Sequence, residues 1–283
     1  MILSVKSVKQ FIVKGLIQII VLILLIYLVF PFIWLLSISF KSTPEIVTGG
    51  LKIIPENLYF DHYRSIINDS NLIQSLLNSL LVSILSMTIT LLIALPAAYS
   101  LVRYKTKIKN AVLGWILASQ IFPAILIIIP LYTVLRYLHL TDSIIGLTMV
   151  YVVWELPFVL WMLYGYIKSI PLELEEAAFI DGATKLQYVY RILFPVILPA
   201  IGATAIFAFI ISWNEFLFAL VLMKNPENIT LPVQLSRFTG MEGQARIGLL
   251  AAASCLATIP SLVLFTFLRR GFKSGLISGA VKV

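Results

Sequence analysis

Charged residues divide this sequence into six long apolar stretches. Four of the stretches contain no charged residue, and the other two contain one glutamate each, Glu155 and Glu215. Each stretch exceeds the roughly 20 apolar residues that cross the hydrocarbon core of a bilayer as a helix. The pattern therefore predicts an all-α polytopic membrane protein with six transmembrane helices. The charged residues that bound the stretches are, in order, Lys14 and Lys41, Asp69 and Arg103, Lys109 and Arg136, Asp142 and Lys168, Arg191 and Lys224, and Arg246 and Arg269.

The composition agrees with lipid as the solvent of this chain. Of its 283 residues, 60% are hydrophobic and 12% are charged, and the mean hydropathy is +1.00. Soluble domains carry about 25% charged residues. The first apolar stretch, residues 15–40, follows three lysines in the manner of a secretory signal peptide, but a signal core spans only about 7 to 15 residues. We therefore expect a retained first transmembrane helix.

Basic residues gather at alternate ends of the predicted helices. The N-terminal tail holds three lysines and no acid, segment 103–109 holds four basic residues, and the C-terminal tail is also basic. In the intervening segments, acids balance the bases. Because cytoplasmic loops are enriched in Lys and Arg, we expect both termini and the segments 103–110 and 168–195 in the cytoplasm, and the segments 41–75 and 223–246 outside. Membrane topology thus accounts for the net charge of +8, and no nucleic-acid partner is expected.

The sequence carries no pattern of a metal, disulfide or nucleotide site of its own. Cys255 is the only cysteine, and His62 and His139 occupy separate loops without a partner at metal-ligand spacing. No G-x-x-x-x-G-K-[ST] phosphate loop occurs, and the spans hold neither a nucleophile with its base nor an H-E-x-x-H pair. We therefore expect no metal site and no catalytic residue in this chain.

Prolines inside the predicted spans favour kinks. Each proline lacks a backbone donor and disturbs the helix around it, although neighbouring helices in a membrane bundle can satisfy the freed groups. These prolines are Pro31, Pro96, Pro123, Pro130 and Pro157.

The inward segment 169–195 predicts two short helices separated by a glycine. Ser169 is suited to cap the first helix. Gly182 stands where a helix would end in a left-handed residue. Thr184 and Gln187 have the spacing of a capping box, which starts the second helix.

One face of the first short helix is small enough for close approach by another protein. The neighbouring acids Glu173 and Glu176 lie on another side, and residues 173–181 contain four acids and no base. A helix that lies in lipid headgroups favours Lys and Arg on its polar face. The acidic character therefore favours docking on a soluble protein over contact with lipid headgroups. The small face consists of Leu174, Ala177, Ala178 and Asp181.

This segment resembles the EAA loop of ABC importer permeases. The resemblance implies a type I importer permease fold in which the loop forms a coupling helix, seated in a cleft of a separate nucleotide-binding subunit. ATP and Mg²⁺ would then be bound by that partner ATPase, with no cofactor in this chain. The matching positions are Glu176-Ala177-Ala178, Asp181-Gly182-Ala183, Ile192, Pro195 and Pro199. The implied docking residues are Leu174, Glu176, Ala177, Ala178, Asp181, Gly182 and Ala183.

A narrower resemblance is to the smaller permease of maltose-type carbohydrate importers. It rests on residues 212–216 (Ser-Trp-Asn-Glu-Phe) and 278–282 (Ser-Gly-Ala-Val-Lys). It implies a second, different permease, two ATPase subunits and an extracytoplasmic solute-binding protein, which delivers a di- or oligosaccharide from outside to the permeases of a prokaryotic inner membrane. In that family the last outer loop can reach into the binding protein, which corresponds here to Lys224, Arg237, Gly240 and Gly243.

The resemblance also implies an organisation along the chain. Residues 1–69 would form the N-terminal tail, the first helix and an external loop. Residues 70–269 would form the transmembrane domain with the coupling loop 169–195, and residues 270–283 a cytoplasmic tail.

Polar residues inside the spans mark candidate positions along a translocation path. Trp213, Asn214 and Glu215 combine an aromatic ring with groups that can hydrogen-bond a sugar. Glu155 is an ionisable residue near the middle of the fourth span, where such residues usually have a partner or line water. Two alternatives for Glu155 stay open: a hydrogen-bonded carboxyl that holds helices together, and the ion site of a secondary transporter that needs no ATPase.

Overall fold

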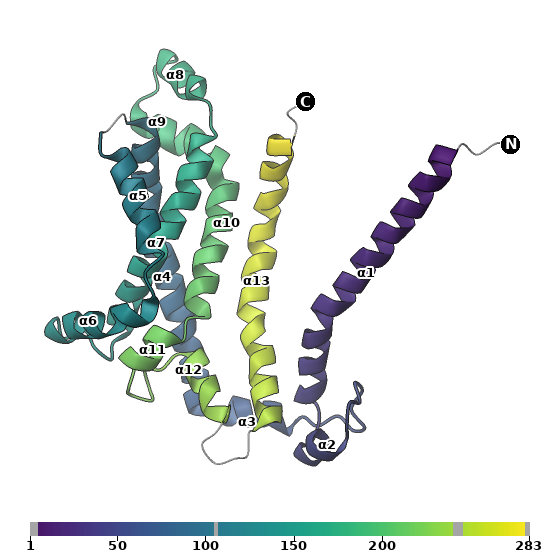
Figure 1. The fold of residues 1–283 in the computed structure, drawn as a ribbon. Helices are drawn as coiled ribbons and strands as arrows, with labels where there is room; N and C mark the ends of the chain where they lie inside the picture. Colours follow the sequence, from purple (N-terminus) through teal and green to yellow (C-terminus); the bar gives the residue numbers. More distant parts are fainter. Residues whose placement is uncertain (1–4, 105–106, 240–245, 281–283) are drawn as a thin grey trace. The chain divides into compact units, whose positions relative to one another are not determined.

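The computed structural model describes residues 5–104, 107–239 and 246–280, and within these ranges its regular elements are helices (Figure 1). The described residues form two compact units. The first unit combines the residues up to 68 with residues 237–256, and the second combines residues 69–236 with those from 257 onward. Helix α13 (Ile247–Ala280) contributes to both units. The predicted all-α class is confirmed.

The first unit is dominated by a long helix with an apolar surface. The side chains from Val13 to Phe32 along α1 are almost all exposed, so this helix offers its apolar surface to lipid or to another subunit. Its end is fixed by the Tyr63 hydroxyl, which lies 2.8 Å from the Ser39 hydroxyl. The elements of this unit are α1 (Val5–Ser39), α2 (Thr43–Thr48), α3 (Asp61–Asn68), the 3₁₀ helix η2 (Arg237–Thr239) and residues 247–256 of α13.

The second unit contains the long helices that follow the predicted second, fourth and fifth spans. Helix α10 continues without a break from α9 through a short π-helix, η1, so that residues 185–213 form one span. The elements are α4 (Ser70–Arg103), α5 (Lys109–Ser119), α6 (Ala124–Tyr137), α7 (Ile144–Lys168), α8 (Leu172–Ile180), α9 (Lys185–Tyr188), η1 (Val189–Leu193), α10 (Phe194–Trp213), α11 (Leu217–Leu222), α12 (Leu231–Ser236) and the remainder of α13.

Helices α4, α7 and α10 pack on one another (Figure 1), and α4 carries a stripe of buried small residues. The stripe runs along α4 at intervals of three or four residues, so its members lie on one face of the helix. Small side chains let helix backbones approach closely in a membrane, where packing rather than the hydrophobic effect holds helices together. All members of the stripe are buried: Ser75, Ser79, Ser83, Ser86, Thr90, Ala94 and Ala98.

The second unit has two distinct ends. The described residues of segments 103–110 and 168–195 lie at one end, where Arg103 pairs with Glu175. Segments 136–144 and 223–236 meet at the other end, where Asp142 accepts a hydrogen bond from the backbone N–H of Lys224. Because α7 runs from one end to the other, the two groups of segments lie on opposite sides of the unit (Figure 1).

The predicted third span differs from the others because it is bent. Among the residues that the structure describes, five helices are long and apolar enough to cross a membrane, and α5 and α6 give a sixth span if together they form one. These two helices meet at an angle of 101°. Pro123 precedes α6 in an extended conformation, and a proline has no N–H to continue the hydrogen-bond ladder of α5. The prolines inside the remaining spans do not interrupt their helices.

Candidate functional site

A rigid corner joins α8 to the long span that follows it. At the end of α8 the N–H of Ala183 donates to the carbonyl of Ala178 (3.0 Å), and the N–H of Gly182 donates to the carbonyl of Phe179 (3.1 Å). This pair of bonds is a Schellman motif, which requires a left-handed residue. Gly182 supplies it with φ of +83° and open space around its Cα, so the predicted role of this glycine is confirmed.

The predicted capping box at the start of α9 is also confirmed. The Thr184 hydroxyl accepts from the N–H of Gln187 (3.3 Å), and the Gln187 side chain accepts from the N–H of Thr184 (2.8 Å). The predicted cap of α8 is wrong, because Ser169 instead ends α7 and donates to the carbonyl of Tyr166. The Schellman motif and the capping box are adjacent, so the turn between α8 and the span that begins at residue 185 is hydrogen-bonded on both sides.

A buried ion pair anchors α8 to the end of α4. The Nε atom of Arg103 lies 2.8 Å from Oε2 of Glu175, and the two side chains are only 9% and 10% exposed. This contact is a charge pair without the alignment of a hydrogen bond. Arg103 also donates to the carbonyl of Ile170 (3.3 Å), and the Tyr99 hydroxyl donates to Oε1 of Glu175 (2.8 Å). One acid of the predicted acidic helix thus points inward.

Sequence reasoning missed Glu175, although a signal was present. Tyr99 and Arg103 are four residues apart at the end of a predicted span, so they lie on one face and suit an acidic partner in the next inward loop. The sequence offers three glutamates there, Glu173, Glu175 and Glu176, and only the packing of α8 selects the middle one.

The outer surface of α8 combines apolar and acidic side chains. Ala178 lies inward, 5% exposed, against a core that includes Tyr188, whereas Leu174, Ala177 and Asp181 are exposed. The helix also exposes Ile180 at 86%, a residue that the sequence pattern did not single out. An exposed isoleucine at the tip of a short, firmly anchored helix, beside Glu176 and Asp181, is a surface suited to docking in a groove of another protein.

Glu155 lies in a buried polar cluster between three helices. Its carboxylate accepts hydrogen bonds from the Ser212 hydroxyl on α10 and from the Thr90 hydroxyl on α4. The Ser212 hydroxyl also lies 2.7 Å from the Ser86 hydroxyl on α4. Glu155 is 1% exposed, and its hydrogen-bond partners among the described residues are both hydroxyls. The cluster therefore joins α4, α7 and α10 in the interior of the unit.

The three candidate pathway residues at the end of α10 have different surroundings. Trp213 is buried, stacks on Phe209 and donates to the carbonyl of Ala257. Glu215 accepts from the Tyr151 hydroxyl (2.7 Å) and from two backbone N–H groups at the start of α11, so it caps that helix. Asn214 is exposed and donates to the carbonyl of Ile210. Of the three side chains, that of Asn214 is the most accessible to a substrate.

At the opposite end of the unit, Asp142 fastens the segment that follows α11. Its backbone is left-handed, with φ of 54°. Its carboxylate accepts from the N–H groups of Lys224 and Asn225, and its carbonyl accepts from the Asn228 side chain. The Lys224 ammonium lies 5.2 Å above the ring of Tyr132. Arg237 is exposed in the first unit, and the other two candidate residues of this loop, Gly240 and Gly243, lie outside the described residues.

Asn78 on α4 holds the next part of the same segment. Its side-chain amide donates to the carbonyls of Glu227 (2.7 Å) and Ile229 (3.0 Å).

We expect Asn78→Ala to leave these carbonyls without that donor and to destabilise the segment by about 1 to 3 kcal/mol. Hydrogen exchange of residues 227–231 should accelerate. Gln74→Ala is the matched control, since Gln74 donates to the Asn78 side chain and not to the segment, and equal exchange in both variants would contradict this anchoring role.

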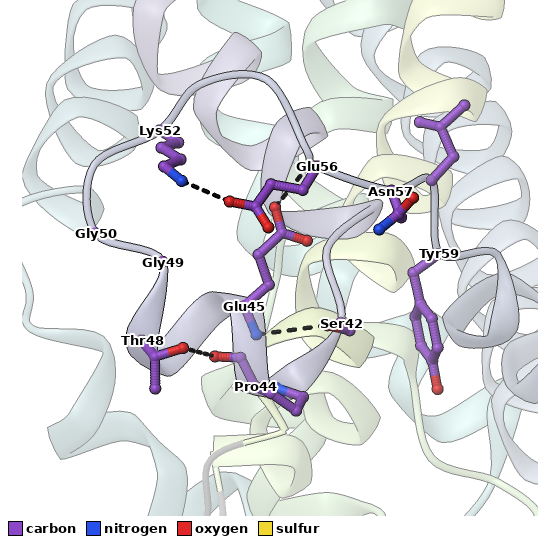
Figure 2. Close-up of a pocket in the computed structure, with 11 residues that line it drawn as sticks. Ser42, Pro44, Glu45, Thr48, Gly49, Gly50, Lys52, Glu56, Asn57 and Tyr59 are labelled. Carbon is purple, nitrogen blue, oxygen red and sulfur yellow. Dashed lines mark hydrogen bonds and ion pairs between the residues drawn. The ribbon is translucent and has the colours of Figure 1, made fainter.

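The first unit contains an open pocket of about 630 Å³, lined by both polar and apolar residues, between α2 and the chain that follows it (Figure 2). Figure 2 shows Lys52 and Glu45 both directed toward Glu56. The Lys52 ammonium pairs with the Glu56 carboxylate, and the Glu45 carboxylate accepts from the N–H of Glu56 (2.8 Å). The hydrogen bond with Lys52 lowers the pKa of Glu56, and the same bond raises the pKa of Lys52. These contacts shape the pocket at its solvent-exposed rim.

Comparison with known proteins places this arrangement among transport proteins. A family model described as "Binding-protein-dependent transport system inner membrane component" matches residues 90–277. A Streptomyces antibioticus protein named as an ABC transporter permease is 48% identical over 229 residues, which covers 81% of this chain and 100% of that protein. The diacetylchitobiose uptake system permease protein DasC of Streptomyces coelicolor is 33% identical over 92% of this chain and 94% of that protein.

A solved structure shares the fold. The crystal structure of a bacterial ABC transporter involved in the import of the acidic polysaccharide alginate matches with a TM-score of 0.79 and 22% identity. The match covers 95% of this chain and 99% of the chain in that structure. The predicted importer permease fold is therefore confirmed.

Proposed function

The chain belongs to the binding-protein-dependent transport system inner membrane component family, and from this membership we propose that it forms one half of the path along which an ATP-driven importer moves a carbohydrate across the membrane. The observation that carries this proposal is the anchored helix α8. It exposes an apolar and acidic surface to a partner and passes through a stiff corner into a membrane span. Such a helix transmits force between two proteins and performs no chemistry.

The names of relatives support a carbohydrate substrate. DasC is a diacetylchitobiose uptake permease, and SugB of Mycobacterium tuberculosis, 33% identical over 90% of this chain and 93% of that protein, is a trehalose transport permease. Both of these sugars are disaccharides. A di- or oligosaccharide is therefore the substrate class that we propose for this chain.

The same membership supports a proposal for the remaining partners. We propose a second, different permease subunit and two nucleotide-binding ATPase subunits, which bind ATP and Mg²⁺. We further propose a solute-binding protein on the outer side, contacted by the segment that contains Lys224, Arg237, Gly240 and Gly243. Both termini would lie in the cytoplasm of a prokaryotic cell, as the basic segments indicate.

The test of this proposal uses the corner at Gly182. The full chain, tagged and co-expressed with the candidate ATPase and the second permease, should retain the ATPase on purification and support ATP-driven uptake. Gly182→Val forces a β-branched residue into a left-handed conformation that is unfavourable by about 1 to 2 kcal/mol, so ATPase retention and uptake should both fall. Uptake should be affected more, because a distorted corner transmits motion poorly.

Gly182→Asn is the matched control, since asparagine tolerates a left-handed backbone far better than valine does. It should behave like the wild type. The proposed function would be overturned by two results together. The wild type and the Asn variant would both fail to retain the ATPase, and uptake would follow an ion gradient in the absence of ATP.

A further inference from the structure

An apolar groove of about 630 Å³ runs between α4 and the continuous helix formed by α9, η1 and α10. Apart from Thr88, Tyr and Lys residues, its lining is made of aliphatic, proline and phenylalanine side chains, among them Leu92, Leu95, Leu186 and Ile201. The volume falls within the range of about 300 to 1,000 Å³ that is usual for ligand sites. Both walls belong to helices that are long and apolar enough to cross a membrane.

One end of the groove is basic and aromatic. Lys185 lines it there, and its ammonium lies 5.4 Å above the ring of Tyr104. Lys185 is exposed, and no carboxylate of the described residues forms an ion pair with it. Tyr190 lines the same region and is 69% exposed. Lysine and tyrosine at the end of a membrane span mark the level of the lipid headgroups.

We propose that this groove binds an anionic phospholipid, with an acyl chain along the apolar lining and the phosphate at Lys185. The charge at the open end decides between the possible occupants. An apolar helix of another subunit would take the Lys185 ammonium out of water without an opposite charge, which is costly. A phosphate neutralises the ammonium, and the lipid tail covers the leucines below it.

The groove is connected to the anchor of α8. Tyr99 lines the groove, and its hydroxyl donates to Glu175 (2.8 Å). The other wall includes the π-helix η1, an element that is frequent at functional sites. A lipid in the groove therefore stabilises α4 and the α9–α10 span, the two helices to which α8 is attached. The consequence for transport rests on the proposed function: the lipid strengthens the coupling between α8 and this span.

The experiment measures lipid retention by the purified full chain and requires neither the ATPase nor a sugar. The chain is reconstituted in nanodiscs that contain equal amounts of phosphatidylglycerol and phosphatidylcholine, transferred to mild detergent, and examined by native mass spectrometry. The wild type should retain phosphatidylglycerol in preference to phosphatidylcholine. Lys185→Gln should weaken this retention about fivefold, which corresponds to the loss of one lysine near an anionic lipid.

Lys168→Gln is the matched control, because Lys168 is also exposed and stacks above a tyrosine ring, that of Tyr164, but does not line the groove. It should retain phosphatidylglycerol like the wild type.

Leu92→Trp tests the apolar part of the groove separately. Leu92 is 70% exposed, so the larger ring narrows the groove without a buried clash and should displace the lipid while Lys185 remains.

Two results would overturn the lipid site. One is equal retention of phosphatidylglycerol by the Lys185→Gln and Lys168→Gln variants. The other is efficient cross-linking of a Leu92→Cys variant to a helix of the second permease in the assembled transporter, which would show that protein fills the groove. Neither result bears on the family membership or on the docking of α8.

Discussion

Replacing Arg103 by alanine is expected to destabilise the protein by about 3 to 5 kcal/mol and to abolish ATP-driven uptake. The variant leaves the Glu175 carboxylate buried, with the Tyr99 hydroxyl as its only remaining described partner. A buried charge that has lost its counter-charge carries a penalty of this size. Arg103 also donates to the carbonyl of Ile170, two residues before α8, so the bond from Tyr99 to Glu175 would be the one described polar link left between α4 and α8. Thermal unfolding in detergent and uptake into proteoliposomes measure the two effects.

Two further variants distinguish the loss of the ion pair from the effect of any charge change on α8. Glu176→Gln changes an exposed acid one position away and should leave stability within about 0.5 kcal/mol of the wild type. A double variant, Arg103→Met with Glu175→Met, removes both charges and should recover most of the lost stability, as replacement of a buried pair by apolar residues often does. If Arg103→Ala unfolded no more easily than Glu176→Gln, the ion pair would not be the anchor of α8.

Glu155→Ala is expected to destabilise the bundle of α4, α7 and α10 by about 2 to 5 kcal/mol. The Thr90 and Ser212 hydroxyls would lose their acceptor in the buried interior of the unit, and a cavity would replace the side chain. The loss should appear as a lower midpoint of thermal unfolding and as faster hydrogen exchange in all three helices.

Glu155→Gln distinguishes the two roles that the sequence left open for this residue. The glutamine amide keeps the shape of the side chain and an oxygen that accepts from Ser212, so a structural role predicts near-normal stability and uptake. A site that must release a proton or bind a cation predicts a folded protein without uptake. Normal folding together with complete loss of transport would therefore revive the ion-coupled interpretation of Glu155. The two hydroxyls that donate to the carboxylate from neighbouring helices favour the structural role.

Several local features of α8 were predictable because short-range geometry decides them. A glycine after an acidic helix end, followed by threonine and glutamine three residues apart, leaves few conformations for the backbone. The left-handed Gly182 and the capping box of Thr184 were predicted correctly for this reason. Ser169 was not, because its hydroxyl can serve either the helix before it or the helix after it, and the structure uses it for α7.

Long-range partners were not predictable in the same way. Glu175, Arg103 and Tyr99 are up to 76 residues apart, and one sequence contains several acids that could satisfy the same base. The hydroxyl partners of Glu155 and the bond between Asn78 and residues 227–229 are likewise set by how helices rotate against one another. The bend of 101° between α5 and α6 is a similar case, since a proline permits a kink but its angle depends on the surrounding packing.

The sequence by itself determined that this chain is a helical membrane protein, where its apolar spans lie, and which loop carries the permease signature. These properties depend on length, hydropathy and local backbone preference, each of which is written in consecutive residues. Only the tertiary structure decided which acid anchors α8, which hydroxyls surround Glu155, and that α4 and the α9–α10 span enclose a groove with a lysine at its end. Such properties arise from side chains that meet after the helices pack, and many sequences with the same hydropathy would pack them differently.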